Sequence, residues 1–395
     1  MKWLKWIPLP VLIGIAAGSA SALFIASLDS VTLLQTKHPW LLWLLPLGGA
    51  AVSLIYMKFG NEAGRGTNLV LEQVHSGSGH VPLRMAPLVL IGTLMTHLFG
   101  GSAGREGTAV QMSGSLSSAI GRKLGLTESE RRRMVLCGIG AGFGSVFGTP
   151  IAGALFGLEA SARGSMRYEA LLPCLIASFT GHWVTLAWGI THSHYAIGVI
   201  PELSWLAVLK VAAAAIAFGL ISSLFVQLTA GLKSLFARGF KHPVLRSFVG
   251  GTVIIALVYG LGSRDYLGLG LPLMEEAFAG DGTPLAFLWK TLFTSVTLGS
   301  GFIGGEVTPL FVIGSSLGSV LSASLAMPAS FLAALGLASV FGAASKTPIA
   351  CTILGLELFG MEGALYLLLA CFISAAVSGR TGIYEADVRA YAPKR

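Results

Sequence analysis

Apolar runs separated by short polar or glycine-rich breaks fill most of this chain. The first run starts at Trp6 and continues for about 20 residues, enough to cross roughly 30 Å of hydrocarbon. The apolar core of a secretory signal is shorter, roughly 7 to 15 residues, so residues 2–28 are predicted to form a retained first helix. Further apolar runs cover residues 40–57, 85–99, 134–158, 171–190, 206–228, 248–261, 285–298, 311–325, 331–344 and 349–378. Several of these are too short or too glycine-rich to span a bilayer alone.

Glycine and proline interrupt the apolar runs at many points. Segments of this kind are typical of transporters, in which half-helices meet near the middle of the bilayer and non-helical backbone lines a cavity. A bundle of uninterrupted spanning helices would not need such breaks. The pattern predicts an all-α integral membrane protein with many tilted and broken membrane helices.

The composition supports a membrane location. Hydrophobic residues make up 54% and charged residues 11% of the 395 residues, whereas soluble domains carry about 25% charged residues. A soluble fold could not cover its surface with so few charges, and a disordered chain shows the opposite bias. The four cysteines lie singly in apolar stretches, without metal-ligand or disulfide spacing. We therefore expect no metal site, no redox chemistry and no cofactor.

The net charge of +8 comes from basic residues at the ends of apolar runs. That placement is typical of cytoplasmic loops and does not indicate nucleic-acid binding. The clusters are Lys2 with Lys5, Arg122 with Arg131–Arg133, residues 233–246 and residues 389–395. Both termini are therefore predicted to be cytoplasmic. Only residues 384–395 follow the last predicted helix, so we expect no soluble regulatory domain.

Two segments recur in the same order about 200 residues apart. GGSAGREGTAVQMSGS and AGFGSVFGTPIAGALFGLE in the first half correspond to GSGFIGGEVTPLFVIGSS and SVFGAASKTPIACTILGLE in the second. The sequence therefore predicts a single membrane domain over residues 1–395 that contains an internal repeat. The first repeat would cover about residues 30–195 and the second about 202–390. Periodicity leaves open whether the repeats are parallel or inverted.

Three glycine-rich blocks are each expected to open an apolar helix: GSAGREGTAV, GIGAGFGSVFGTP and GSGFIGGEVTP. A helix start has unpaired N–H groups and a partial positive charge, so it can hold an anion without a full countercharge. Weak partial charges suit an ion that must also leave. The alternative is that these glycines only allow close helix packing. Three blocks with polar residues in register favour anion binding.

Two glutamates, Glu106 and Glu306, lie within these blocks. An ionised carboxylate at the bilayer centre costs about 2.5–3.5 kcal/mol, so it is retained only with a partner, a cavity or a task. Burial also favours protonation, which makes each residue a candidate proton carrier. Glu106 has a structural alternative, an ion pair with the adjacent Arg105 or a cap of the helix start. Glu306 has no basic neighbour in sequence nearer than Lys290.

Four segments in order resemble the signature segments of the CLC anion channels and transporters: GREGT, GSVFGTPIAGALFGLE, GGEVTP and GIYEADV. The resemblance covers nearly the whole chain. It implies an inverted-repeat helical fold and a homodimer with one anion pathway in each subunit. It also implies that Glu106 is the gating glutamate, which competes with anions and swings out when protonated. Tyr384 would be the inner tyrosine that donates its hydroxyl to the central anion.

The chain departs from the chloride members of that family at four places. Thr108 stands where they have the proline of GREGP, and Ala160 stands where the chloride antiporters have a second proton glutamate. GEVTP replaces G-x-F-x-P and introduces Glu306 and Thr308. GRGTN replaces the serine-bearing GSGIP segment. An ungapped alignment places Arg65 at the position of that serine. Thr67 or Asn68 would be chemically better ligands for a mobile anion than Arg65.

These replacements resemble the bacterial fluoride-exporting branch of the family. The resemblance implies a fluoride/proton antiporter in the bacterial plasma (inner) membrane, a multi-pass protein in the lipid bilayer with fluoride and protons as its transported partners. Glu306 would supply the inner proton site that Ala160 does not. The predicted site residues are Glu106 and Glu306 for protons, and Thr308, Tyr384, Gly104, Arg105, Gly107, Thr67 and Asn68 for the anion.

Other functions remain open from the residues alone. Within transport, the alternatives are a chloride or nitrate exchanger and an uncoupled anion channel. An intramembrane enzyme would have to use His97, Glu106 and His182, but lone membrane histidines are more often packing residues and no H-E-x-x-H or G-x-S-x-G motif is present. We therefore expect a transporter and not an enzyme.

Overall fold

The structure is a computed structural model that describes residues 6–76, 81–161, 167–192 and 195–384. The predicted basic clusters at Lys2 with Lys5 and at residues 389–395 lie outside the described residues. The predicted cytoplasmic location of both termini therefore stays a prediction. Regular structure in the described residues is helical, apart from one isolated bridge between Gly104 and Gly305. The all-α fold class predicted from the sequence is confirmed.

The α-helices form two series whose members correspond in order. The first series is α1 (Pro8–Lys37), α2 (Leu45–Ile55), α3 (Thr67–Ser76), α4 (Met85–Leu98), α5 (Glu106–Lys123), α6 (Glu128–Phe147), α7 (Pro150–Ala160) and α8 (Leu171–Ala187). The second series is α9 (Trp205–Gly239), α10 (Pro243–Leu261), α11 (Leu271–Ala279), α12 (Ala286–Gly299), α13 (Val307–Leu325), α14 (Ala329–Ser345), α15 (Pro348–Phe359) and α16 (Ala364–Val377). Each series opens with a long helix and continues with shorter ones, as an internal repeat requires.

Only some of these elements are long and apolar enough to cross a membrane. Within the described residues they are Pro8–Lys37, Pro39–His75, Tyr168–Ala187, Trp205–Gly239, Pro243–Leu261 and Val307–Leu325. Shorter apolar helices include α4, α7, α14, α15 and α16. The prediction that several segments are too short to span alone is confirmed.

Local sequence explains several helix boundaries. The apolar run 134–158 is divided between α6 and α7 because Gly148 adopts a left-handed conformation (φ +75°) and Pro150 then opens the next helix. Thr127 and Glu130 form a reciprocal capping box at the start of α6. Ser204 caps α9 by accepting a hydrogen bond from the Ala207 N–H.

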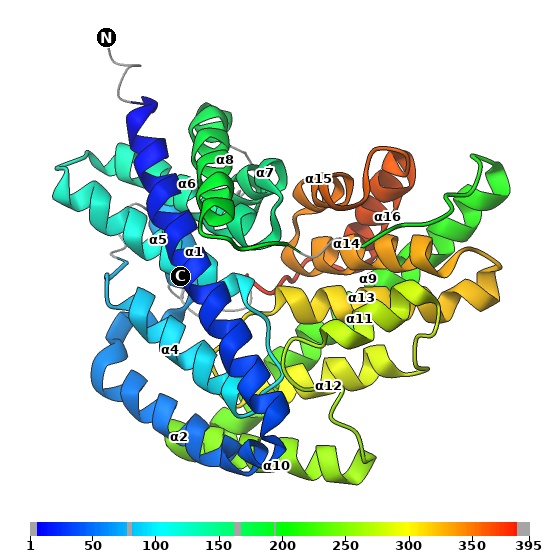
Figure 1. Cartoon of the computed structure of the whole chain (residues 1–395), viewed down its shortest axis with the longest axis horizontal. Coiled ribbons are helices and arrows are strands. Elements are labelled where there is room, and N and C mark those ends of the chain that lie inside the picture. Colours follow the sequence, from blue (N-terminus) through cyan, green and yellow to red (C-terminus); the bar gives the residue numbers. More distant parts are fainter. Residues whose placement is uncertain (1–5, 77–80, 162–166, 193–194, 385–395) are drawn as a thin grey trace, which may run out of the picture. The chain divides into compact units, whose positions relative to one another are not determined.

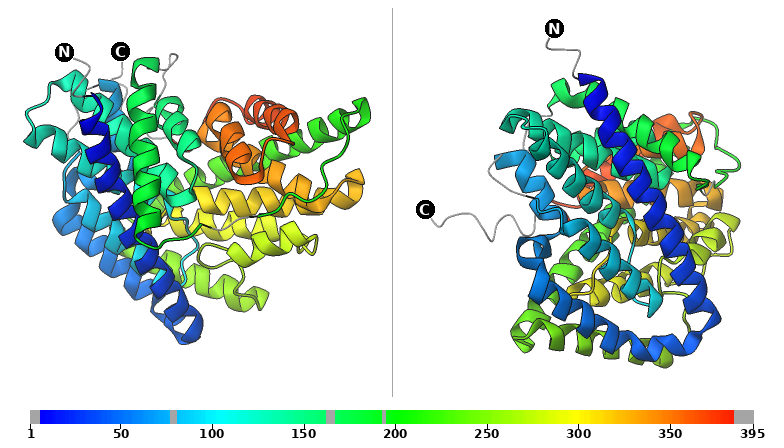
Figure 2. Two further views of the ribbon diagram at one scale, coloured as in Figure 1. Left: turned by 45° about the horizontal axis from the view of Figure 1, so that its top comes forward. Right: turned by 60° about the vertical axis from the view of Figure 1, so that its left-hand side comes forward.

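The chain divides into two compact units. The first unit comprises residues 1–34, 54–94 and 106–193, and the second comprises 35–53, 95–105 and 194–395. In the first unit, α6 packs against α5, α7 and α8, and every residue of α6 from Met134 to Val146 is buried. Helix α1 lies along α8 in this unit, where Gly14 and Gly18 let the two backbones approach closely (Figure 2).

In the second unit, α14 occupies the equivalent central position. It packs against α13, α9, α16, α15 and α11, and every residue from Phe331 to Ser345 is buried. Helices α13 and α14 lie side by side (Figure 1). Their closest approach is between Gly314 and Gly336, where a Cβ atom on either glycine would collide with the backbone of the other.

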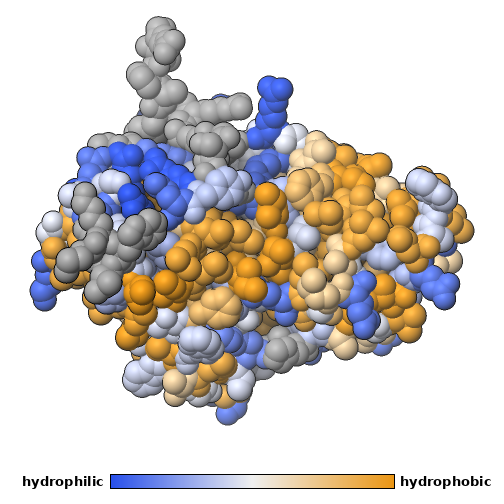
Figure 3. Space-filling model, turned by 90° about the horizontal axis from the view of Figure 1, so that it is seen from above, coloured by the Kyte–Doolittle hydropathy of each residue, from blue (hydrophilic) through white to orange (hydrophobic). Residues whose placement is uncertain are grey.

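Large apolar side chains are exposed on several of the long helices. Figure 3 shows hydrophobic residues at the molecular surface, and on α9 they include Leu206, Leu209, Ile216 and Leu220. So much exposed apolar surface is unfavourable in water, and contact with lipid tails would remove that penalty. The surface is that of a multi-pass membrane protein.

Candidate functional site

The glycines of the two repeated motifs meet directly within the second unit. The Gly104 N–H donates to the Gly305 carbonyl (N···O 2.6 Å), and the Gly305 N–H donates to the Gly104 carbonyl (2.8 Å). The two backbones thus form an isolated antiparallel bridge. The bridge therefore joins the segments of the two repeated motifs, which come from opposite halves of the sequence.

Glu106 is the first residue of α5, and its side chain is 0% exposed. Gly107 follows it in the first helical turn, where backbone N–H groups have no partner within the helix. The carboxylate is thus buried at the positive end of the helix dipole. Arg105, the residue before it, is half-buried.

Thr108 lies in the same turn of α5 and is buried. Its hydroxyl shares a hydrogen bond with the hydroxyl of Thr93 on α4 (2.7 Å). The proline of the chloride-type motif would not form this contact. Thr93 was missed by the sequence analysis because no motif includes it and it lies on another helix.

Glu306 is the residue that precedes α13, and Thr308 is the second residue of the helix. The Thr308 side chain is buried, whereas Glu306 is only half-buried. The expectation that both glutamates lie in the interior therefore holds fully for Glu106 and partly for Glu306. This start of α13 is the counterpart of the start of α5 in the other unit.

The register of α13 against α14 places Thr308 and the segment of Tyr384 at the same end of the second unit. Gly314 is opposite Gly336, and the rings of Phe311 and Phe341 lie 5.6 Å apart, so the two helices are antiparallel. Thr308 is consequently level with the last turn of α14. At that turn the Ala344 carbonyl accepts a hydrogen bond from the Ile383 N–H (2.9 Å), directly before Tyr384.

The GRGTN segment ends where α3 begins at Thr67. The Thr67 hydroxyl accepts a hydrogen bond from the Gln111 side chain on α5 (3.2 Å). Asn68 is the second residue of α3. Arg65 instead pairs with two carboxylates, Glu62 at 3.3 Å and Glu72 at a shorter distance. The guanidinium is thus engaged by local acids, which favours Thr67 and Asn68 as anion ligands at this segment.

The middle glycine-rich block, GIGAGFGSVFGTP, does not open a helix as expected. Most of GIGAGFGSVFGTP lies inside the second half of α6, and only Thr149 and Pro150 stand at the start of α7. A Cβ atom at Gly138 would collide with α5, and one at Gly140 would press on the backbone of Gly153 on α7. These glycines serve close helix packing, the alternative considered above.

The histidines of the enzyme hypothesis make ordinary structural contacts. In the second unit, His97 Nε2 lies 3.1 Å from the Ala103 carbonyl. In the first unit, the His182 ring lies 5.6 Å from that of His192, which contacts the Ser145 carbonyl. No group of three or more His, Cys, Asp or Glu suited to a metal occurs among the described residues.

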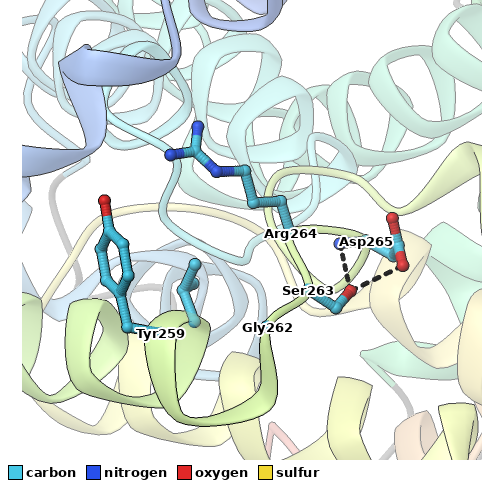
Figure 4. A pocket seen from close by; sticks show the side chains of 6 residues that line it. Tyr259, Gly262, Ser263, Arg264 and Asp265 are labelled. Carbon is cyan, nitrogen blue, oxygen red and sulfur yellow. Dashed lines mark hydrogen bonds between the residues drawn. The ribbon is translucent and has the colours of Figure 1, made fainter.

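A surface pocket in the second unit lies apart from these motifs in sequence. It is lined by Val258, Tyr259, Gly262, Ser263, Arg264 and Asp265 at the end of α10 and in the following loop (Figure 4). The Ser263 hydroxyl donates to the Asp265 carboxylate (2.6 Å), and the Arg264 guanidinium donates to the Pro39 carbonyl (3.0 Å). None of the predicted site residues lines this pocket.

Known proteins resemble this chain over nearly its whole length. A family model described as voltage gated chloride channel matches residues 48–379. A chloride/fluoride channel protein from Pseudomonas syringae pv. tomato is 47% identical over 390 residues, which are 97% of this chain and 86% of that protein. An H(+)/Cl(-) exchange transporter ClcA from Cronobacter sakazakii is 28% identical, over 88% of this chain and 80% of its own.

Solved structures show the same fold. A CLC-type fluoride/proton antiporter superposes with a TM-score of 0.94 at 34% sequence identity, covering 97% of both chains. A slow cyanobacterial Cl-/H+ antiporter superposes with a TM-score of 0.83 at 19% identity, covering 98% of this chain and 97% of that one.

Proposed function

The chain belongs to the voltage-gated chloride channel (CLC) family, and from this premise we propose that it exports fluoride from the cytoplasm in exchange for protons. The observation that carries the proposal is the complete burial of Glu106 at the N-terminus of α5. A carboxylate is costly in a membrane interior unless it has a task. At a helix start it can take the place of an anion when ionised and leave that place when it binds a proton.

Fluoride as the substrate follows from two further observations. The relative with 47% identity is named a chloride/fluoride channel protein, and the antiporter structure that superposes with a TM-score of 0.94 is a fluoride/proton antiporter. Fluoride is small and strongly hydrated, so its site needs short, well-aimed donors. Thr308 and Tyr384, whose backbone segments lie at the same end of the α13–α14 pair, would supply hydroxyl donors of this kind.

The remaining predicted residues take roles that fit their positions. Glu306, half-buried before α13, would pass protons to the cytoplasmic side in place of Ala160. Thr67 and Asn68, in the first turn of α3, would form the inner part of the anion path. Backbone groups of Gly104, Arg105 and Gly107 around the start of α5 would bind the anion when Glu106 is withdrawn.

The assembly and setting of the transporter are also part of the proposal. We place it in the bacterial inner membrane as a homodimer with both termini in the cytoplasm, with one pathway for fluoride and protons in each subunit and no enzymatic activity. The two repeats, with helices α1–α8 in the first and α9–α16 in the second, would be inverted relative to each other within one membrane domain. Light scattering of the detergent-solubilised protein tests the dimer.

Liposome transport tests the main proposal. Purified protein is reconstituted, and fluoride or chloride efflux is recorded together with proton uptake, with and without a pH gradient. We expect a proton gradient to drive fluoride uphill and chloride to move far more slowly. Glu106→Gln should abolish the coupling, while Glu128→Gln, the same change at an exposed residue paired with Arg132, should not. Proton-coupled uphill export that persists at the normal rate in Glu106→Gln would refute the assigned role.

An uncoupled fluoride channel is the second candidate, favoured by the word channel in the name of the Pseudomonas relative. A channel carries anions only down their electrochemical gradient. A reversal potential equal to the Nernst potential of fluoride at every imposed pH gradient would establish this alternative. Efflux whose reversal potential moves with the proton gradient would exclude it.

A further inference from the structure

One face of α12 carries three polar side chains that the proposed mechanism does not use. Lys290, Thr294 and Thr297 are spaced at i, i+4 and i+7, so they share one side of the helix. All three are 0% exposed in the second unit. Buried polar groups at helical spacing are expensive unless they have defined partners, so their contacts are informative.

Two of the three side chains hold Ser102 in the segment that leads to the gating glutamate. The Thr297 hydroxyl accepts a hydrogen bond from the Ser102 N–H (3.2 Å), and the hydroxyls of Thr294 and Ser102 are 2.9 Å apart. Ser102 is thus bonded to α12 through both its backbone and its side chain.

Lys290 is connected to Ala103, the next residue of that segment, through a shared carbonyl oxygen. Its Nζ donates to the Gly268 carbonyl (2.8 Å) and to the Tyr266 carbonyl (3.1 Å). The Gly268 carbonyl also accepts a hydrogen bond from the Ala103 N–H (3.3 Å). One carbonyl oxygen therefore joins the buried ammonium group to the backbone of Ala103.

Residues 101–104 are consequently fixed at every position. The Gly101 N–H donates to the Thr96 carbonyl (2.8 Å), Ser102 is bonded to α12, Ala103 to Gly268, and Gly104 to Gly305. Glu106 follows only two residues later in the sequence, so α12 and the loop before α11 hold the backbone that leads into it.

The partners of Lys290 make its role unusual. Both of its acceptors are carbonyl oxygens, and no carboxylate lies within ion-pair distance of Nζ in the described part of the chain. A buried lysine without a carboxylate partner is hard to explain as half of a stabilising ion pair. Its contacts instead connect it to the segment that leads to the gating glutamate.

We propose that Lys290, with Thr294 and Thr297, is a positioning residue for the gating glutamate: it holds residues 101–104 so that Glu106 competes with the anion from a fixed place. The inference rests on the proposed role of Glu106 as gate. It does not depend on which halide is carried. Weakening the α12 contacts should make the Glu106 carboxylate compete less well with the anion. The number of protons moved per anion should then fall.

A double-mutant cycle tests this inference. Lys290→Met and Thr297→Val are each combined with Glu106→Ala, which removes the side chain that is to be positioned. In the background with Glu106 we expect each variant to lower the proton-to-anion ratio at least twofold and to change the anion exchange rate about tenfold. In the Glu106→Ala background the same changes should alter the anion rate by less than twofold.

Matched controls come from the same structure. Thr291→Val removes a buried α12 hydroxyl that bonds only within its own helix, to the Phe287 carbonyl. Lys210→Met removes a lysine that donates to a single carbonyl, that of Ala326, at an exposed position. Neither control should change the proton-to-anion ratio. Thr294→Val and Thr297→Val answer the same question should Lys290→Met fail to fold.

Three outcomes would overturn the proposal. The first is that Lys290→Met or Thr297→Val has the same effect with and without Glu106. The second is an unchanged proton-to-anion ratio. The third is that Thr294→Val and Thr297→Val are indistinguishable from Thr291→Val. Calorimetric titration of fluoride provides a second readout if Glu106→Ala passes no anion, because the α12 variants should then change anion affinity only when Glu106 is present. If the protein carries chloride in preference to fluoride, the cycle is run with chloride, so a failure of selectivity is separable from a failure of positioning.

Discussion

Gly104 and Gly305, 201 positions apart in the sequence, exchange two backbone hydrogen bonds of 2.6 and 2.8 Å. Each belongs to one of the two repeated motifs, so the bridge joins the motifs through backbone atoms alone. The neighbouring Gly304 is sterically restricted, because a Cβ atom there would collide with the Cβ of Ala103. Ala103 and Gly304 therefore leave no room for a larger side chain at position 304.

Gly304→Ala should therefore destabilise the bridge and reduce transport. We expect the free energy of unfolding to fall by about 1–3 kcal/mol, as overpacking usually does. Ala103→Gly combined with Gly304→Ala should restore most of the loss, because it removes the other partner of the collision. Thermal unfolding in detergent measures both variants. Gly64→Ala, at a position with open space around it, is the control.

The Thr93–Thr108 hydrogen bond predicts a specific pattern of coupling. Thr93→Val and Thr108→Val should each lower the free energy of unfolding by about 1 kcal/mol, since each removes the hydrogen bond between the two buried hydroxyls. The double variant should cost no more than the worse single one. Additive losses in thermal unfolding would mean that the two hydroxyls act independently.

The neighbours Arg65 and Thr67 are expected to behave differently. Arg65→Met removes a partly exposed ion pair with Glu62 and Glu72, so stability should fall by about 1 kcal/mol at most and anion transport should persist. Thr67→Val keeps the shape of the side chain and removes a hydroxyl of the proposed anion path, so fluoride affinity should drop severalfold. Calorimetric titration with fluoride compares the two. A larger loss of affinity in Arg65→Met than in Thr67→Val would reverse the assignment at this segment.

Glu306→Gln tests the second proton residue. Because Glu306 is half-buried and Ala160 provides no carboxylate in its place, proton transfer should slow by about tenfold or more while passive anion binding persists. Simultaneous recording of proton and fluoride fluxes in liposomes separates these two effects. Glu306→Gln with unchanged turnover and stoichiometry would make this residue part of the scaffold.

Much of the fold follows from the sequence because glycine and proline mark the helix ends. Gly148 and Pro150 separate α6 from α7, and the starts of α5 and α13 lie at the two glutamate motifs. Repetition of the motifs about 200 residues apart also predicts the two matching series of helices. These features are local, so a linear pattern is enough to find them.

Contacts between distant elements are not available from such patterns. The glycines of α6 resemble an anion-binding block in the sequence, yet they pack helices, because the same residue type serves both purposes. Thr93 and Gln111 carry no motif and acquire their roles only through their partners on other helices. Lys290 stands alone in an apolar run, and only its two carbonyl acceptors reveal the network that it supports.

The contact of Gly314 with Gly336 limits how the second unit can move. Rotating α13 about its axis would turn a bulkier neighbour, such as Ile313, into space that admits only a hydrogen atom, so α13 and α14 must move as one rigid body. Conformational change at this location is left to side-chain rotation at the helix ends. The α13–α14 pair is therefore expected to keep the same backbone arrangement throughout the transport cycle.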